Sequence, residues 1–335
     1  MMNPSHSIRE RDLICPACRG TLAVGARGGE CAGCARSYPT VAGLLDLRLE
    51  SDRYLDLEAE RAKAERLHAL EPATDLRGLA ESYYAMTDDV VDARHERFLR
   101  HITGSETRGE ALAACLPARG RILEVGCGTG GLLVAAARAG LDIAGVDIAA
   151  RWLVVARRRL TDHGLEVPLV AASAERLPWP DGHFDAVVAD SVLEHLDAPS
   201  DAVREWARVL RPGGRLVVWS PNRFTLATDP HVGLWGVGWL PRSWVRGYLR
   251  LRGRDVWPPR TLSVAEARRL ATAPGLGGVE VDVPGIPEGW ARTFPGPQRL
   301  LIRAYEASLK VRPARDLLRA VGPLWELRAI REEAA

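Results

Sequence analysis

The sequence lacks a long apolar run: no stretch reaches the roughly 18 consecutive apolar residues of a membrane span. The first twelve residues are polar and contain no apolar signal core, so we expect a cytoplasmic location. Six cysteines among 335 residues are too few for a disulfide framework. A formal net charge of +2 gives no excess of one sign that would demand nucleic acid or membrane as a partner. What remains is a globular chain, long enough for one large core and a small module.

Four of the six cysteines form two Cys-x-x-Cys pairs that are separated by twelve residues. Each pair can bring two thiolates to one metal ion, and two pairs complete a tetrahedral zinc site. The surrounding segment 13–47 has short β-like pieces and glycine-rich turns, and a ribbon this small needs a metal to supply its folding free energy. We therefore predict a zinc-ribbon module over residues 1–50, with a structural zinc ion bound by Cys15, Cys18, Cys31 and Cys34.

From residue 121 onward, short apolar runs alternate with amphipathic helical stretches. This rhythm is typical of parallel βαβ units whose strands are buried on both faces. It predicts an α/β fold with a Rossmann-like doubly wound sheet. The predicted strands are 121–125, 143–146, 169–172, 184–189 and 215–220, and the predicted helices are 131–139, 151–160 and 198–210.

The flanking segments follow other patterns. Charged helical stretches at 52–70 and 78–103 suggest a helical linker or lid over residues 51–108. Residues 222–262 form an insert rich in proline, glycine, tryptophan and arginine. Order resumes with a capping box at Ser263 and Glu266, which opens a helix. Later pieces are a strand at 279–283, a helix at 298–309 and a last strand at 324–330.

The most specific signal is a glycine loop that follows the first apolar strand and opens a helix. Glycines let the backbone turn tightly and approach a ligand, and the helix N-terminus offers free N–H groups. The glycine spacing also fits the dinucleotide-binding pattern Gly-x-Gly-x-x-Gly, so the glycines alone do not exclude a dinucleotide as the ligand. Glu124, two residues before the first glycine, favours a cationic ligand such as S-adenosylmethionine, which carries a sulfonium and an ammonium group. The loop reads Glu124-Val-Gly126-Cys127-Gly128-Thr-Gly130-Gly131.

Five motifs in order make residues 121–220 resemble a class I S-adenosylmethionine-dependent methyltransferase domain, of the type found in ubiquinone biosynthesis. The glycine loop is the first motif and Val146-Asp147 the second, and segments 173–185, 190–196 and 210–215 match the others. We place the whole methyltransferase domain at 109–335. A separate resemblance concerns segment 13–47 of the N-terminal ribbon, which is similar to the small zinc-ribbon proteins that activate tRNA and protein methyltransferases.

The resemblance implies a role for particular side chains. Ser173 stands where the family often has an aspartate that contacts the adenine amine. Tyr83, in the helix before the domain, is expected either to close over the cofactor or only to pack. The implied cofactor residues are Glu124, Gly126, Cys127, Gly128 and Gly130 around the methionine end, Asp147 and Ile148 at the ribose, Ser173, Ala174 and Glu175 at the adenine, and Asp190 and Ser191 near the methyl group.

The insert at 222–262 is the expected acceptor region, because substrates in this fold lie over the carboxyl ends of the strands. His231 is the candidate general base, since histidine titrates near neutral pH; a hydrogen-bonded loop histidine is the alternative. Residues 242–252 alternate arginines with Trp244 and Tyr248. Such a helix either makes a peripheral membrane contact or packs as a lid with a solvated arginine face.

The predicted activity is methyl transfer from S-adenosylmethionine, most simply O-methylation of a small-molecule, lipid-linked or glycan acceptor. A ribosomal or transfer RNA base methyltransferase is the second hypothesis, because ribosomal-RNA guanine methyltransferases also carry an N-terminal zinc module. RNA binding should produce a broad basic field, which the near-neutral charge does not supply. A non-catalytic cofactor-binding scaffold is the third hypothesis, and the intact cofactor motifs speak against it.

Overall fold

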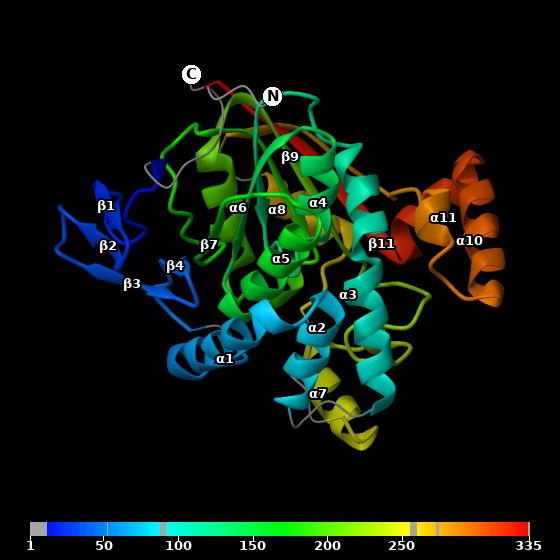
Figure 1. The fold of residues 1–335 in the computed structure, drawn as a ribbon. Coiled ribbons are helices and arrows are strands. Elements are labelled where there is room, and N and C mark those ends of the chain that lie inside the picture. Colours follow the sequence, from blue (N-terminus) through cyan, green and yellow to red (C-terminus); the bar gives the residue numbers. More distant parts are fainter. Residues whose placement is uncertain (1–11, 52, 88–91, 255–259, 273–274, 334–335) are drawn as a thin grey trace.

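The computed structural model describes residues 12–51, 53–87, 92–254, 260–272 and 275–333. Within these ranges eleven strands form one sheet, in the order β1-β2-β3-β4-β7-β6-β5-β8-β9-β11-β10 (Figure 1). No helix in the described part of the chain is both long and apolar enough to cross a membrane.

The centre of this sheet confirms the predicted α/β fold. Strands β5, β6, β7, β8 and β9 pair in parallel, whereas β11 is antiparallel to both of its neighbours, β9 and β10. The strand order reverses between β5 and β8, and a parallel sheet binds its ligand at such a switch point, beyond the carboxyl ends of the strands. The strands span Arg121–Val125 (β5), Asp142–Asp147 (β6), Leu169–Ala171 (β7), Phe184–Asp190 (β8), Leu210–Pro221 (β9), Leu276–Asp282 (β10) and Leu324–Arg331 (β11).

Each face of the sheet has its own apolar core, because successive strand residues point to opposite faces. Ile122 belongs to one core and Leu123 to the other, and both are fully buried. Helices α1 to α5 cover the first face, and α6 and α8 cover the second. These helices span Leu57–Leu70 (α1), Leu76–Ala85 (α2), Asp92–Ala113 (α3), Gly131–Arg138 (α4), Ala150–Asp162 (α5), Pro199–Val209 (α6) and Val264–Ala271 (α8).

The helical stretch predicted at 78–103 is wrong in its extent, because two helices, α2 and α3, take its place. The amides of Met86 and Thr87 bond to carbonyls only three residues back, which closes α2 with a tight turn. Helix α3 then runs to Ala113, past the domain boundary that we placed at residue 108. A Cβ atom at Gly109 would lie 2.6 Å from the carbonyl oxygen of Gly131, so these glycines allow α3 and α4 to pack backbone against backbone.

The ribbon continues the central sheet at its other edge. Its strands are Leu22–Gly25 (β1), Gly28–Cys31 (β2), Ser37–Val41 (β3) and Leu44–Asp46 (β4). Strand β4 pairs in parallel with β7, with Leu45 opposite Val170. Leu22 and Tyr38 of the ribbon are buried in the same core as Trp179 and Trp206. The ribbon is therefore an extension of the sheet, although the module boundary at residue 50 stays a prediction.

The remaining elements lie toward the C-terminus and in the insert. The insert contains the short turn η4 (Val237–Trp239) and helix α7 (Arg242–Leu251), which confirms the helix expected at 242–252. The short helix α9 (Glu288–Ala291) precedes α10 (Gly296–Leu309) and α11 (Arg312–Val321). Of the described residues in α10 and α11, none is buried, and the pair stands at the end of the molecule opposite the ribbon (Figure 1). Helix α11 was not predicted.

Candidate cofactor site and zinc centre

The glycine loop between β5 and α4 needs its glycines for conformation and for space. Gly126, Gly128 and Gly130 have φ angles of 69°, 50° and 77°, in the left-handed region that favours glycine. A Cβ atom at Gly126 would lie 2.3 Å from a methyl carbon of Val192. Cys127 is buried at the centre of the loop and packs against Gly145, so it fills space there.

Glu124 lies beneath this loop as a buried acid without a partner. One of its carboxylate oxygens, Oε2, has no hydrogen-bond partner among the described residues. Burial raises the pKa of Glu124 well above its usual range, and the nearby carboxylates of Asp190 and Asp147 raise it further. A buried carboxylate without a partner is unfavourable, so Glu124, with two further acids nearby, favours a cation at this position. The ammonium group of S-adenosylmethionine meets that requirement.

Asp147 ends β6, the neighbour of β5, so it lies at the same edge as Glu124. Its two carboxylate oxygens accept hydrogen bonds from the amides of Gly128 (2.8 Å) and Ala149 (2.7 Å). Burial raises the pKa of Asp147, and these two bonds act in the opposite direction. Each oxygen keeps a further lone pair, so the carboxylate can also accept from two ribose hydroxyls.

The segment expected at the adenine follows β7. The Ser173 hydroxyl donates to the Glu175 carboxylate, and the Ala174 carbonyl accepts from the Trp206 indole at 3.1 Å. The carbonyl of Ile148, directly after Asp147, accepts from the Arg48 guanidinium at 3.0 Å. A residue of the ribbon side thus contacts the loop beside the ribose position.

Asp190 is held by an arginine that sequence reasoning missed. Two guanidinium nitrogens of Arg108, on α3, donate to the two carboxylate oxygens of Asp190. The same guanidinium lies 5.0 Å from the ring centre of Trp290, on α9. Ser191 follows with a φ of 58°, which is uncommon for a residue with a side chain. No motif marks Arg108 or Trp290, because both come from segments far from the glycine loop in sequence.

Arg159 is a second residue that the sequence analysis did not identify, and it holds the glycine loop through a hydrogen bond. The Arg159 side chain on α5 is fully buried. Its guanidinium donates to the carbonyls of Thr129, in the loop, and Ile102, in α3, and pairs with Glu106. Arg159 therefore ties the loop to two helices. A buried arginine at helical spacing gives no sequence signal, because exposed helix faces also carry arginines.

Tyr83 lies within an aromatic cluster. Its ring centre is 4.2 Å from that of Trp152 on α5 and 5.0 Å from that of Tyr84. These contacts are those of a packing residue. Its predicted contact with the cofactor stays a prediction.

His231 lies between two carboxylates. Its ring nitrogens are 3.5 Å from an oxygen of Asp229 and 3.6 Å from one of Glu194. Burial alone would lower the pKa of His231, but these two acids raise it to about 9. An imidazole in this setting holds its proton at neutral pH, which argues against the expected role of a general base acting alone.

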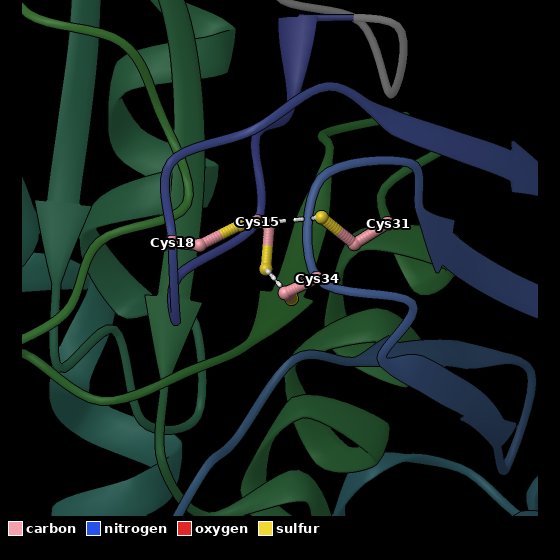
Figure 2. Close-up of side chains that lie close together, drawn as sticks. All are labelled: Cys15, Cys18, Cys31 and Cys34. Carbon is pink, nitrogen blue, oxygen red and sulfur yellow. Dashed lines mark hydrogen bonds between the residues drawn. The ribbon is translucent and has the colours of Figure 1, made fainter.

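The four cysteines of the ribbon converge on one point (Figure 2). The sulfur atoms of Cys15 and Cys34 are 3.7 Å apart, and those of Cys18 and Cys31 are 3.4 Å apart. Thiolates that bind one tetrahedral zinc at about 2.3 Å have sulfur–sulfur distances of about 3.8 Å, so the four groups fit zinc. The Tyr38 hydroxyl lies 3.0 Å from the Cys15 sulfur and can orient it.

The two cysteine pairs have matching backbone conformations. Arg19 and Ala35, which follow the second cysteine of each pair, have φ angles of 60° and 53°. The amides of Gly20 and Gly33 donate to the sulfurs of Cys18 and Cys31 at 3.4 and 3.3 Å. Such N–H···S bonds stabilise thiolates, which are the form that binds zinc.

Comparison with known proteins supports the assignment of the central part of the chain. Residues 123–218 match the family described as methyltransferase domain. The ubiquinone biosynthesis O-methyltransferase of Xanthomonas axonopodis pv. citri is 38% identical over 108 residues, which are 32% of this chain and 45% of that protein. The demethylmenaquinone methyltransferase of Thermus thermophilus is 45% identical over 100 residues, 29% of this chain and 46% of that protein. The chain thus spans about half the length of these curated relatives.

Among solved structures, an S-adenosylmethionine-dependent methyltransferase of Thermotoga maritima, described as a possible histamine N-methyltransferase, is 20% identical with a TM-score of 0.45. The similarity covers 71% of this chain and 96% of that one. Residues 123–218 of this chain therefore match a methyltransferase domain, and the strand order and the glycine loop agree with that match.

Proposed function

We propose that this protein transfers the methyl group of S-adenosylmethionine to an oxygen atom of a small-molecule, lipid-linked or glycan acceptor. The observation that carries the proposal is the buried carboxylate of Glu124, which lies beside Asp147 at the switch point of the sheet and whose Oε2 has no hydrogen-bond partner in the part of the chain that the structure describes. Asp147 suits the ribose of either kind of cofactor. The acid at Glu124 suits a cationic cofactor and repels a pyrophosphate.

Oxygen is proposed as the methylated atom because of the residues around the expected acceptor position. Relatives of this chain are named as O-methyltransferases and as C-methyltransferases, so the matched region does not choose between the two. The carboxyl ends of β8 and β9 carry buried acids and histidines, which suit a polar, ionisable acceptor atom. The sequence lacks Asn/Asp-Pro-Pro-Tyr after β8, the pattern that grips planar amines in many base methyltransferases.

The purified protein, incubated with methyl-labelled S-adenosylmethionine and fractionated extract, is expected to place label in the small-molecule or lipid fraction. A carbon-13 label then identifies the attached atom, because methyl groups on oxygen and on carbon have different NMR shifts. The Asp147→Asn variant is the matched control and should transfer much less label. Label in the RNA fraction would favour the second hypothesis. Cofactor binding without transfer to any fraction would favour the scaffold.

We propose in addition that α7 lets the protein touch an anionic membrane that carries its acceptor. Val245 and Leu249 of α7 are buried on the insert, whereas Trp244 and Leu251, which are two turns apart, are 66% and 85% exposed. Exposed apolar side chains beside arginines suit an interface of anionic lipid.

The double variant Trp244→Ser/Leu251→Ser is expected to reduce co-sedimentation with vesicles of phosphatidylcholine and phosphatidylglycerol by about tenfold. Burying two large apolar side chains contributes several kcal/mol at full burial, and partial insertion contributes a part of that. Leu300→Ser, which removes a 69% exposed leucine from α10, is the control and should bind as wild type. Equal binding by wild type and double variant would contradict the membrane contact.

A further inference from the structure

Two histidines and a glutamate meet at the acceptor side of the sheet, outside the cofactor residues. Glu194 and His195 lie in the short turn η3 (Leu193–His195), which follows β8, and His231 lies in the insert after β9. One possible ligand atom from each of the three residues lies within 4.8 Å of the other two. The cluster is built by tertiary structure, because the insert brings His231 back across 35 residues.

The carboxylate of Glu194 is fully buried and only half satisfied. Its Oε2 accepts a hydrogen bond from the Ser220 hydroxyl at 3.0 Å. Its Oε1 has no hydrogen-bond partner among the described residues and faces the His231 ring, with Nε2 at 3.6 Å. An atom pair at 3.6 Å is too far apart for a hydrogen bond. Two ligands of one tetrahedral zinc, at about 2.1 Å each, are about 3.4 Å apart, so the gap has the size that a shared metal requires.

A hydroxyl group orients one of the two imidazoles, and a carboxylate lies beside the other. The Tyr54 hydroxyl contacts Nδ1 of His195 at 2.7 Å, and Asp229 lies 3.5 Å from Nδ1 of His231. Asp229 is itself held by the amides of His231 and Val232. Metal-binding histidines generally use one ring nitrogen for the metal and give the other to a carboxylate or hydroxyl. In His195 this arrangement leaves Nε2 for a metal, and in His231 Nε2 is the ring nitrogen that faces Glu194.

We propose that Glu194, His195 and His231 bind one divalent transition-metal ion. Two imidazoles and a carboxylate form a donor set that suits ions such as Zn²⁺ or Mn²⁺. Three protein ligands leave coordination positions open, which is the arrangement of catalytic metal sites. The side chain of His231 is 23% exposed and that of His195 is half-buried, so solvent reaches the cluster.

The role of the ion rests on the proposed function. An acceptor hydroxyl that binds the ion loses its proton to water more readily, because the positive charge stabilises the oxyanion. That oxygen then forms a bond to the methyl carbon while the carbon–sulfur bond breaks and its electron pair stays on sulfur. S-adenosylhomocysteine leaves as a neutral thioether.

Calorimetric titration with Mn²⁺ of the full chain, loaded with only the one zinc equivalent that the four thiolates of the ribbon hold, tests the site without any methyl transfer. Mn²⁺ prefers nitrogen and oxygen ligands to thiolates, so the ribbon does not compete. We expect one Mn²⁺ per chain, with binding weakened at least tenfold in Glu194→Gln and in His231→Gln. The control is His163→Gln, because His163 pairs with Glu106 on the other face of the sheet and should leave Mn²⁺ binding unchanged.

The Tyr54→Phe variant separates a loss of metal binding from a loss of the fold. Tyr54 is 48% exposed, so this substitution should not unfold the chain. Loss of an outer partner typically lowers metal affinity by about 10- to 100-fold, and we expect the lower end. Absence of Mn²⁺ binding in the wild type, or equal binding in all three variants, would overturn the proposal. Mn²⁺ binding without methyl transfer to any acceptor would contradict the proposed function and leave the metal site intact.

Discussion

Replacing Glu124 with glutamine or Asp147 with asparagine is expected to weaken S-adenosylmethionine binding by about 10- to 100-fold each. Hydrogen bonds to charged groups contribute about 1.5–3 kcal/mol, which corresponds to that range. Glutamine keeps the shape of Glu124 but has no charge to offer the cofactor ammonium. Asparagine keeps one acceptor oxygen at position 147 and replaces the other with a donor, which opposes the ribose hydroxyls and the amides of Gly128 and Ala149.

Isothermal titration with S-adenosylmethionine and with S-adenosylhomocysteine measures both effects. Glu166→Gln is the control, because Glu166 is exposed and lies before β7, away from the glycine loop. The unfolding temperature of each variant shows whether the fold is kept. If both substitutions left cofactor affinity unchanged, the assignment of this loop would fail.

The same experiment has a pH arm. Burial and two neighbouring acids raise the pKa of Glu124 in the free protein, but a cationic cofactor needs the ionised carboxylate. Binding therefore releases a proton, and affinity is expected to rise with pH until Glu124 is ionised in the free protein. Titration of the cofactor itself contributes one part of the pH dependence of the affinity. The Glu124→Gln variant should keep that part and lose the rest. A slope that persists unchanged in Glu124→Gln would assign the proton to another group.

Removal of zinc is expected to have the largest effect on stability. Structural zinc contributes about 10–16 kcal/mol in zinc-finger peptides. The buried apolar residues of this ribbon belong to the cores of the main sheet and form no separate core among the described residues. Cys18→Ser should therefore release the ion and unfold the ribbon. Cys115→Ser is the matched control, because Cys115 lies outside the cluster and bonds only weakly to the Ala111 carbonyl and to Arg328. Metal content by elemental analysis and unfolding by calorimetry are the measurements.

The effect should reach the cofactor site, because the ribbon is part of the sheet. Loss of β4 would expose the edge of β7, and amide exchange at Val170 and Ala171 is expected to accelerate. Arg48 would also release the carbonyl of Ile148, beside the ribose position, so S-adenosylmethionine affinity should fall in Cys18→Ser but not in Cys115→Ser. A zinc-free Cys18→Ser protein that melts and binds cofactor as wild type would contradict the structural role of the ion.

Local sequence determined much of the fold. The apolar runs and helical periods predicted the five parallel strands, and the pairing of Ser263 with Glu266 predicted the start of α8. Glycine spacing and the acid before it predicted the cofactor loop. These features depend on interactions between residues that are only a few positions apart, so a short stretch of sequence is enough to predict them.

Tertiary structure decided what depends on distant pairing. The parallel pairing of β4 with β7 joins two segments more than 120 residues apart, and no local pattern shows which sheet edge a ribbon strand will meet. Arg108 meets Asp190 across 82 residues, and Arg159 reaches Thr129 across 30. Glu194, His195 and His231 become one cluster only when the insert folds back over the ends of β8 and β9. The sequence alone determined the five parallel strands and most of the helices between them, because short-range sterics and periodicity decide them. The acceptor side was decided by the packing of remote segments, because its charges acquire partners only when burial brings them together.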